Sequence, residues 1–172
     1  MAVVGVAQHS IFGRMKRAAM LDVHVYEAVE ADRTATGQAA VVVALVAVAQ
    51  AIGSAGEGAP GIIGGLVAAL LGWFVWSGVT YLIGDKLLGG TATWDELLRT
   101  IGFAQSPGVL GIFAIVPVVG GLVRVIVAIW ILIAGIIAIR QALDFGTGKA
   151  VLTAVIGWLA LAIPMMIVGM AF

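Results

Sequence analysis

The sequence predicts an all-α protein, a polytopic transmembrane helical bundle of five spans with short amphipathic cytoplasmic helices. Hydrophobic residues make up 62 % of the 172-residue chain and charged residues only 10 %, whereas a soluble domain carries about 25 % charged residues. Five stretches contain no Asp, Glu, Lys, Arg or His: Thr34–Gly56, Gly58–Gly84, Thr100–Val123, Val125–Ile139 and Ala150–Phe172. A helix needs about 20 apolar residues to cross a hydrocarbon core of about 30 Å. All but the fourth stretch reach that length unaided.

We divide the chain into a cytoplasmic amphipathic segment, residues 1–36, and a five-span membrane domain, residues 37–172. The spans are expected near residues 37–56, 60–84, 101–119, 121–140 and 150–171. The fourth reaches crossing length only if Arg124 lies one turn inside the helix and extends its guanidinium to the interface. Pro117, Gly120 and Gly121 suit the turn before it, because Pro removes a helix donor and Gly tolerates unusual backbone angles.

The basic residues predict the orientation. If the amino terminus is cytoplasmic, eight of the nine Lys and Arg residues face the cytoplasm: Arg14, Lys16, Arg17, Arg33, Lys86, Arg99, Arg140 and Lys149. Cytoplasmic loops carry such an excess of Lys and Arg. A single crossing between Thr100 and Ile139 would export Arg140 and Lys149, so the bias favours zero or two crossings there. We take two, which places the carboxyl terminus outside.

Two short helices are expected before the first span. Between Ser10 and Ala19 one helical face is apolar, while the three basic residues lie off it: Arg14, Lys16 and Arg17. Such a helix lies on an anionic membrane surface, or its apolar face packs on the protein's own spans, and the sequence leaves both open. Asp22 has the residue type and position of an N-cap for a second, acidic helix.

A third short helix is expected at Thr93. Thr93 and Glu96 have the spacing of a capping box, and apolar residues follow at i, i+3, i+4 and i+7 from Trp94. This interfacial helix would lead into span three, with Trp94 in the headgroup layer. Four other tryptophans fall near span centres: Trp73, Trp76, Trp130 and Trp158. Their indole donors need partners, such as Ser77, Thr80 or carbonyls freed around Pro164.

Small residues recur within the spans. Examples are Gly61 and Gly65 at GxxxG spacing, Gly108 and Gly111, and the series Ala44, Ala47, Ala49 and Ala51. In lipid, small residues let helix backbones approach closely. They predict tight packing within the bundle, and the same pattern also fits an oligomer face.

The chain offers few groups for chemistry. It has no cysteine, and its two histidines, His9 and His24, both precede the first span. These facts exclude thiolate metal sites and disulfides, and leave no span imidazole for a haem or for a serine nucleophile. We predict no cofactor, no metal site and no catalytic residue. The formal net charge is zero and no basic face exists, so no nucleic-acid partner is expected. Arg124 is either a counter-ion for an anionic headgroup or ligand, or an end residue that snorkels to water.

Three segments resemble the membrane domain of the Ypt-interacting-protein (YIP) family. They are TWDELLRTIGFAQSPGVLG from Thr93 to Gly111, the paired Gly120 and Gly121, and IWILIAGIIAIRQALDFGTGKA from Ile129 to Ala150. ADRTATGQA, from Ala31 to Ala39, is similar to the same position in prokaryotic members. The likeness extends from about Leu21 to the carboxyl end, and its most specific part is RQALD followed by TGKA. The family resemblance implies five crossings with the amino terminus inside, in a prokaryotic plasma membrane.

Eukaryotic members of that family associate with prenylated small GTPases of the Rab type and assist vesicle formation. This chain has no Asp-Leu-Tyr-Gly-Pro motif and only a short cytoplasmic leader. The trafficking role therefore does not carry over with the resemblance.

The loop from Arg140 to Lys149 suggests a site at the membrane surface. Arg140 and Asp144, at i and i+4, could pair and hold the end of span four, which would leave Lys149 for a phosphate group. The alternative is a capped helix followed by a turn through Gly146 and Gly148. Together, the candidate contacts for lipid or a partner are Arg14, Lys16, Arg17, Trp94, Arg124, Arg140, Asp144 and Lys149.

From these observations we expect a non-enzymatic membrane protein that acts as a scaffold or accessory subunit, or in membrane organisation. Its partners would be the lipid bilayer and either other membrane subunits or further copies of itself. The alternative is a carrier or channel for a small neutral or lipid-like solute, which needs a polar path that the spans barely provide.

Overall fold

The computed structural model describes residues 10–55 and 62–171, and every regular element in these ranges is a helix. The elements are α2 (Ile11–Ala19), α3 (Val23–Ala31), α4 (Ala35–Gly53), α5 (Ile62–Tyr81), η2 (Leu82–Leu87), α6 (Trp94–Ala104), η3 (Ser106–Ile115), α7 (Gly120–Ala142) and α8 (Thr147–Ala171). The predicted all-α bundle is confirmed.

Four helical segments among the described residues are long and apolar enough to cross a membrane: Ala35–Gly53, Ile63–Leu87, Trp94–Ile115 and Gly120–Ala142. The 25-residue α8 adds a fifth apolar helix. Large apolar side chains are exposed along these helices, for example Val41, Leu45, Val48 and Ile52 on α4 and Leu122, Ile126, Ile129 and Ile133 on α7. A soluble monomer rarely exposes apolar faces of this length. The chain is therefore a multi-pass membrane protein whose helices contact the lipid bilayer.

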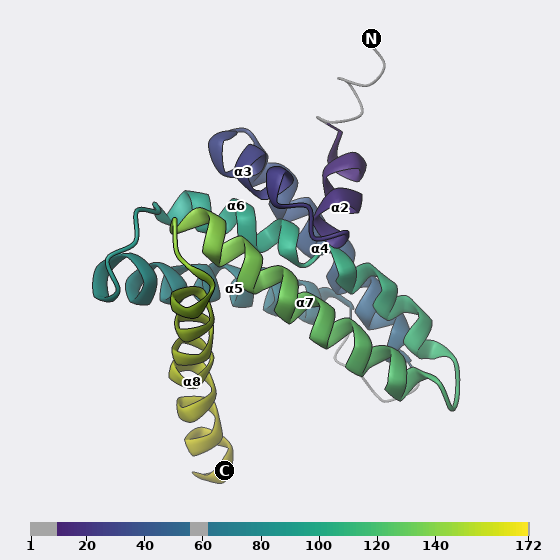
Figure 1. Ribbon diagram of the computed structural model, residues 1–172. Coiled ribbons are helices and arrows are strands. Elements are labelled where there is room, and N and C mark those ends of the chain that lie inside the picture. The colour runs from purple at the N-terminus through teal and green to yellow at the C-terminus, as the bar shows by residue number, and fades with distance from the viewer. Residues whose placement is uncertain (1–9, 56–61, 172) are drawn as a thin grey trace, which may run out of the picture.

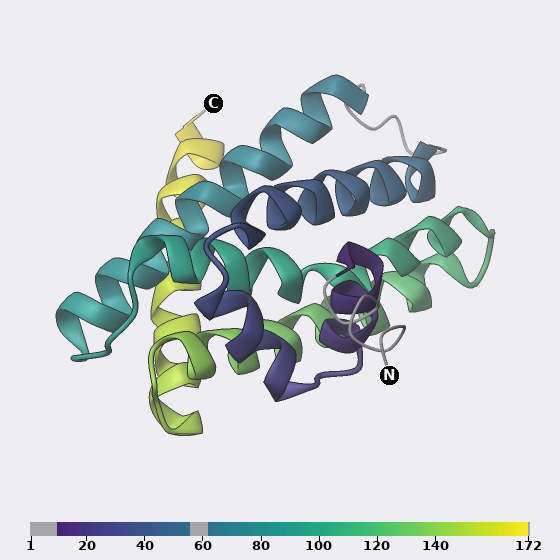
Figure 2. The same cartoon turned by 90° about the horizontal axis from the view of Figure 1, so that it is seen from above.

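The continuous segment of α6 and η3 forms the centre of the bundle. It lies between α4 and α7, with α5 beyond α4, as the view from above shows (Figure 2). The short helices α2 and α3 cover one side of this layer, whereas α8 extends away on the other side (Figure 1). Consistent with its central place, every residue from Leu97 to Ala104 is buried.

Two hydrophobic clusters hold these layers together, and α6 contributes to both. The first joins α2 and α3 to α4, α6 and α7, through residues such as Tyr26, Val42, Phe103 and Ala138. The second joins α6 and α7 to α8, through residues such as Leu97, Ile139, Leu143 and Ala154. Alanine occupies many of the buried positions, as expected where helices approach closely in lipid.

The N-terminal helices pack on the protein itself. Met15 and Ala18 of α2 belong to the first cluster, so the packing alternative holds for this face. The expected division of α2 into an apolar and a basic face is wrong at two residues. The Arg14 side chain is buried on the inner face beside Met15, and Phe12, which belongs to the expected apolar face, is exposed. Asp22 caps α3 as predicted, since its carboxylate accepts a hydrogen bond from the His24 N–H at 3.0 Å.

The capping box at the start of α6 is confirmed. Thr93 Oγ1 accepts a hydrogen bond from the Glu96 N–H, and Glu96 Oε2 accepts one from the Thr93 N–H at 2.7 Å. The turn between η3 and α7 differs in detail from the prediction. Pro117 lies in it, but the positive φ of 73° falls on Val118, and Gly120 and Gly121 already belong to α7.

Two glycines make the tightest helix contacts. A Cβ atom at Gly53 would lie 2.1 Å from the Gly111 carbonyl oxygen, and one at Gly120 would lie 2.2 Å from the Ala114 carbonyl oxygen. Real Cβ atoms never come so close, so only glycine permits these approaches. Gly65 has no atom within 4 Å of its Cβ position, and Gly61 lies outside the described residues.

Two central tryptophans find backbone partners that the sequence did not suggest. Trp73 Nε1 donates to the Leu98 carbonyl at 3.0 Å, and Trp130 Nε1 donates to the Ala19 carbonyl at 2.7 Å. The proposed partners Ser77 and Thr80 do not accept these bonds, and their buried hydroxyl groups have no hydrogen-bond partner within the described structure.

Candidate lipid and partner interface

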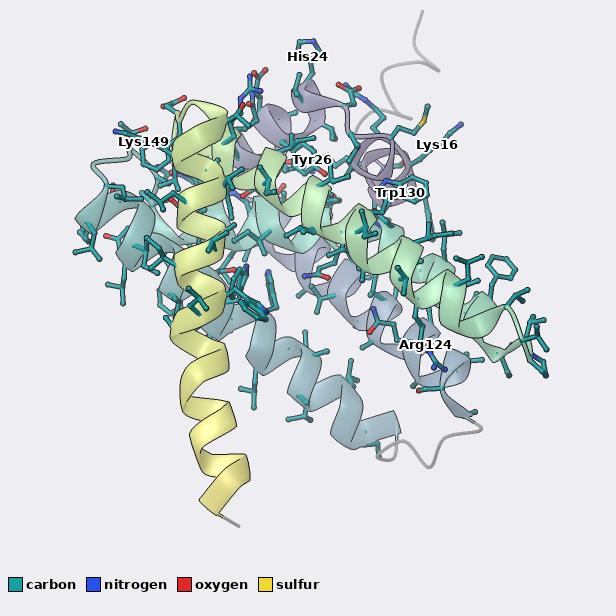
Figure 3. The ribbon with its side chains drawn as sticks, turned by 60° about the horizontal axis from the view of Figure 1, so that its bottom comes forward. Lys16, His24, Tyr26, Arg124, Trp130 and Lys149 are labelled. Atoms are coloured by element: carbon teal, nitrogen blue, oxygen red, sulfur yellow. The ribbon has the colours of Figure 1, made fainter. Side chains whose placement is uncertain are left out.

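The predicted contact residues gather mainly at one end of the bundle, which we call the polar end: α2, α3 and the loops at 88–93 and 143–146. Figure 3 shows Lys16, His24 and Lys149 in the upper part of the view and Arg124 well below them. Side-chain bonds join its parts. Gln141 Nε2 donates to Glu27 Oε1 at 2.9 Å, and Thr91 Oγ1 donates to Asp144 Oδ2 at 2.7 Å. The polar end is therefore a connected surface.

The loop after α7 does not contain the pair that the sequence suggested. α7 ends at Ala142 and Asp144 has a left-handed φ of 53°, so the two residues no longer share a helical face. Asp144 bonds to Thr91, and within the described residues no ion pair joins it to Arg140, whose side chain is exposed. The pair hypothesis is therefore wrong. The alternative is right that the helix ends in a turn, but Leu143 and Asp144 form this turn, and Gly148 already belongs to α8.

The Lys149 ammonium group makes its contacts within the protein. Its Nζ donates to the Leu88 carbonyl at 3.2 Å and lies 5.1 Å from the centre of the Phe145 ring. These contacts join the start of α8 to the end of η2. Lys149 thus holds two loops of the polar end together, while the Arg140 side chain is exposed.

Of the three basic residues on α2, Arg14 acts inside the protein. It is 3 % exposed, and its guanidinium donates to Asp32 Oδ2 at 2.6 Å and to Gln38 Oε1 at 3.1 Å. Hydrogen bonds from Thr34, and then from Arg14, lower the pKa of the Asp32 carboxyl to about 2. This pair fixes α2 against the start of α4.

The outer face of α2 remains exposed. Arg17 bonds to Asp22 at 2.8 Å, whereas Lys16 is exposed between Phe12 and Met20, which are 70 % and 69 % exposed. These three residues recur at i, i+4 and i+8. Large apolar side chains on either side of a lysine form a surface that suits the boundary between headgroups and acyl chains. One face of α2 therefore packs on the protein, and the opposite face is suited to contact with lipid.

Trp94 begins α6 close to the polar end. Its ring centre lies 4.5 Å from that of Phe74, and it contacts the position where Gly78 would carry a Cβ atom. The indole is 37 % exposed, so it contributes an aromatic edge to the surface. An indole that is half in contact with protein suits the membrane interface.

Arg99 has a structural role in addition to its predicted contribution to the cytoplasmic charge. It is 4 % exposed, and its Nε donates to the Val29 carbonyl at 3.0 Å and also to the Glu30 carbonyl. The last carbonyls of a helix lack partners within that helix. Arg99 therefore caps the carboxyl end of α3 and fixes α3 on α6. The only local indication of this role in the sequence is the position of Arg99, three residues after the capping-box Glu96 and directly before a predicted span.

Glu30 faces other carboxylates at the polar end. Burial, and then the charges of Glu96 and Asp144, raise the pKa of its carboxyl from 4.5 to about 7. The folded state therefore holds this proton more tightly than the unfolded chain does. The contribution to stability is complete below pH 4.5 and is lost as the pH rises towards 7.

We expect Glu30→Gln to make the protein less sensitive to pH between 5 and 8. The variant lacks the titrating group. Between pH 5 and pH 8 its free energy of unfolding should therefore fall by about 1 kcal/mol less than that of the wild type, after allowance for solvent screening. Thermal unfolding of the purified protein in detergent at both pH values measures the effect, which corresponds to about 2–4 °C. Asp95→Asn, which removes an exposed carboxylate, is the control. Equal pH responses of the wild type and Glu30→Gln would contradict the assignment.

Arg124 lies at the opposite end of the bundle. It is in the second turn of α7, and its Nη2 donates to the carbonyl of Gly53 at 3.3 Å. This bond joins the start of α7 to the end of α4. The structure therefore separates the predicted contact residues into a polar end and one distant arginine.

No curated protein and no solved structure matches the chain in the comparisons made. The model of one protein family does match, under the description Yip1 domain, and it covers residues 23–169. The match begins at α3 and includes α4 to α7 and most of α8, which are the helices described above. It agrees with the resemblance seen in the sequence, and the chain belongs to the Yip1 domain family.

Proposed function

We propose that this protein is a non-enzymatic scaffold or accessory subunit of a membrane assembly. The observation that carries the proposal is the outer face of α5. Gly64, Ala68 and Gly72 recur there at i, i+4 and i+8, and all three are exposed. Neither glycine has an atom within 4 Å of its Cβ position. In lipid, small residues at this spacing allow a second helix to approach closely.

The tight contacts inside the bundle are made by other glycines, such as Gly53 and Gly120, so the α5 face is left for a helix of another copy or subunit. The outer face of α2 at the polar end, together with the exposed Arg140 near the end of α7, supplies a second contact region. We further propose that residues 1–36 and the loops of the polar end face the cytoplasm of a prokaryotic cell, that five helices cross its plasma membrane, and that the carboxyl terminus is outside. The asymmetry of the basic residues supports this orientation.

The chain has no cysteine, so one introduced cysteine reports on one position without background. We expect Ala68→Cys in native membranes to form a disulfide-linked dimer, or an adduct of defined mass with another subunit. Ile129→Cys, on the lipid-facing side of α7, is the matched control and should stay monomeric. Purification in mild detergent followed by mass spectrometry identifies the species. Equal cross-linking of both variants would indicate random collision and would count against the α5 contact.

Arg140→Ala tests the contribution of the polar end to the same assembly. It removes an exposed charge without a structural bond in the described residues, so partner recovery should fall while thermal stability stays within about 0.5 kcal/mol of the wild type. Unchanged recovery would remove Arg140 from the interface. Saturable flux of a small neutral solute through liposomes that contain the purified protein would instead favour the carrier function.

A further inference from the structure

A cavity lies between α4, η3 and α7, at the end of the bundle opposite the polar end. Its volume is about 310 Å³, and its lining includes Gln50 of α4, Ser54 directly after α4, Gly111 of η3, and Arg124, Val127 and Ile131 of α7. A second hollow of about 260 Å³ adjoins Arg124 from the side of the turn before α7. The Arg124 side chain therefore borders a hollow on each of two sides.

Two backbone features occur at this cavity: a close approach of α4 to η3, and the 3-10 geometry of η3. The contact of Gly53 with the Gly111 carbonyl brings α4 and η3 together at the cavity wall. η3 itself is a 3-10 helix of ten residues, whereas such helices rarely exceed 3–4 residues. At membrane depth, irregular backbone is tolerated where it is buried in protein or lines a cavity. The shape of η3 thus points to this hollow independently of Arg124.

Two side chains, those of Arg124 and Gln50, make one part of the cavity lining polar. Arg124 donates to the Gly53 carbonyl, and a guanidinium has five N–H donors, so this bond is compatible with a contact to an anion. Gln50 contributes an amide that makes no side-chain hydrogen bond within the described part of the chain. Val127 and Ile131 continue the lining along α7 as an apolar surface. The cavity combines anion donors at one end with an apolar path beside them.

We propose that this cavity binds the phosphate of an anionic membrane phospholipid, with Arg124 and Gln50 as donors and with Val127 and Ile131 against an acyl chain. The position of Arg124 along α7 agrees with a headgroup contact. Arg124 lies one turn from the start of this helix, where the headgroup layer meets the hydrocarbon. The charge also agrees with an anionic ligand at this place, because Arg124 is the one basic residue in the sequence outside the group predicted to face the cytoplasm. A water-soluble phosphate would leave the apolar lining uncovered.

The test is a titration of the full-length protein in detergent, followed by native mass spectrometry. The probes are dioleoyl phosphatidylglycerol, the diacylglycerol with the same chains, and inorganic phosphate. We expect the wild type to bind the phospholipid, and Arg124→Gln to bind it at least about tenfold more weakly, because a charge-assisted contact is lost. Arg33→Gln, which removes an exposed charge before the start of α4, should change binding less than about threefold.

Three outcomes would overturn the proposal: equal losses in Arg124→Gln and Arg33→Gln, undiminished binding by Arg124→Gln, or equal binding of inorganic phosphate. Binding of the diacylglycerol as strongly as the phospholipid would also overturn it, because the phosphate would then be dispensable. Ala128→Leu provides a second variant if Arg124→Gln does not fold. Ala128 lines the same cavity, so the larger side chain should exclude the acyl chain and weaken binding while Arg124 stays in place.

Discussion

Gly53→Ala is expected to destabilise the protein by about 2–3 kcal/mol, in the range of overpacked sites. The new methyl group would lie 2.1 Å from the Gly111 carbonyl oxygen and 3.3 Å from the Ala114 Cβ atom. Neither neighbour is the mobile end of a side chain, so α4 and η3 must move apart. Thermal unfolding in detergent should show a decrease of about 5–10 °C in Tm.

Gly37→Ala is the matched control for that variant. Gly37 lies in the same helix, and no atom is found within 4 Å of its Cβ position. Alanine has the higher helix propensity, so this change should leave stability equal or raise it by up to about 1 kcal/mol. If the two variants melted at the same temperature, the close approach of α4 and η3 would be contradicted.

Arg99→Ala is expected to release α3 from the bundle and to destabilise the protein by about 2–4 kcal/mol. The substitution removes charge-assisted bonds to the Val29 and Glu30 carbonyls and leaves these groups without partners in a buried place. Lysine keeps the charge but not the planar donor geometry, so Arg99→Lys should be intermediate. Hydrogen exchange of the α3 amides is the specific measurement, because it should accelerate more than exchange in α7.

Arg17→Ala is the comparison for Arg99. Its bond to Asp22 joins two side chains that are each about a third exposed, and pairs of this kind contribute about 0–1 kcal/mol. Exchange in α3 as slow in Arg99→Ala as in the wild type would show that the arginine does not hold this helix.

The parts of the fold that could be predicted are those determined by short segments of sequence. The capping box of Thr93 and Glu96 and the N-cap at Asp22 depend on residues within one turn of each other. The membrane class follows from composition and from uncharged stretches, which need no tertiary information. These features were correct because the physical cause lies next to the residue concerned.

The errors concern contacts between distant residues. The prediction that Arg14 lies on the outside of α2 fails because its partners, Asp32 and Gln38, lie 18 and 24 positions away. The Arg99 bonds span 69 and 70 positions, and the bond from Trp130 to Ala19 spans 111. Helical periodicity contains no information about such pairs. The 3-10 geometry of η3 was also not foreseen, because an apolar stretch has the same composition in either helix type.

The bond between Trp130 and Ala19 places the last carbonyl of α2 beside the middle of α7. This single indole couples the first described helix to a long apolar helix 111 positions further along the chain. The amphipathic segment and the membrane domain therefore cannot separate without the loss of that bond, which leaves the Ala19 carbonyl without its indole donor.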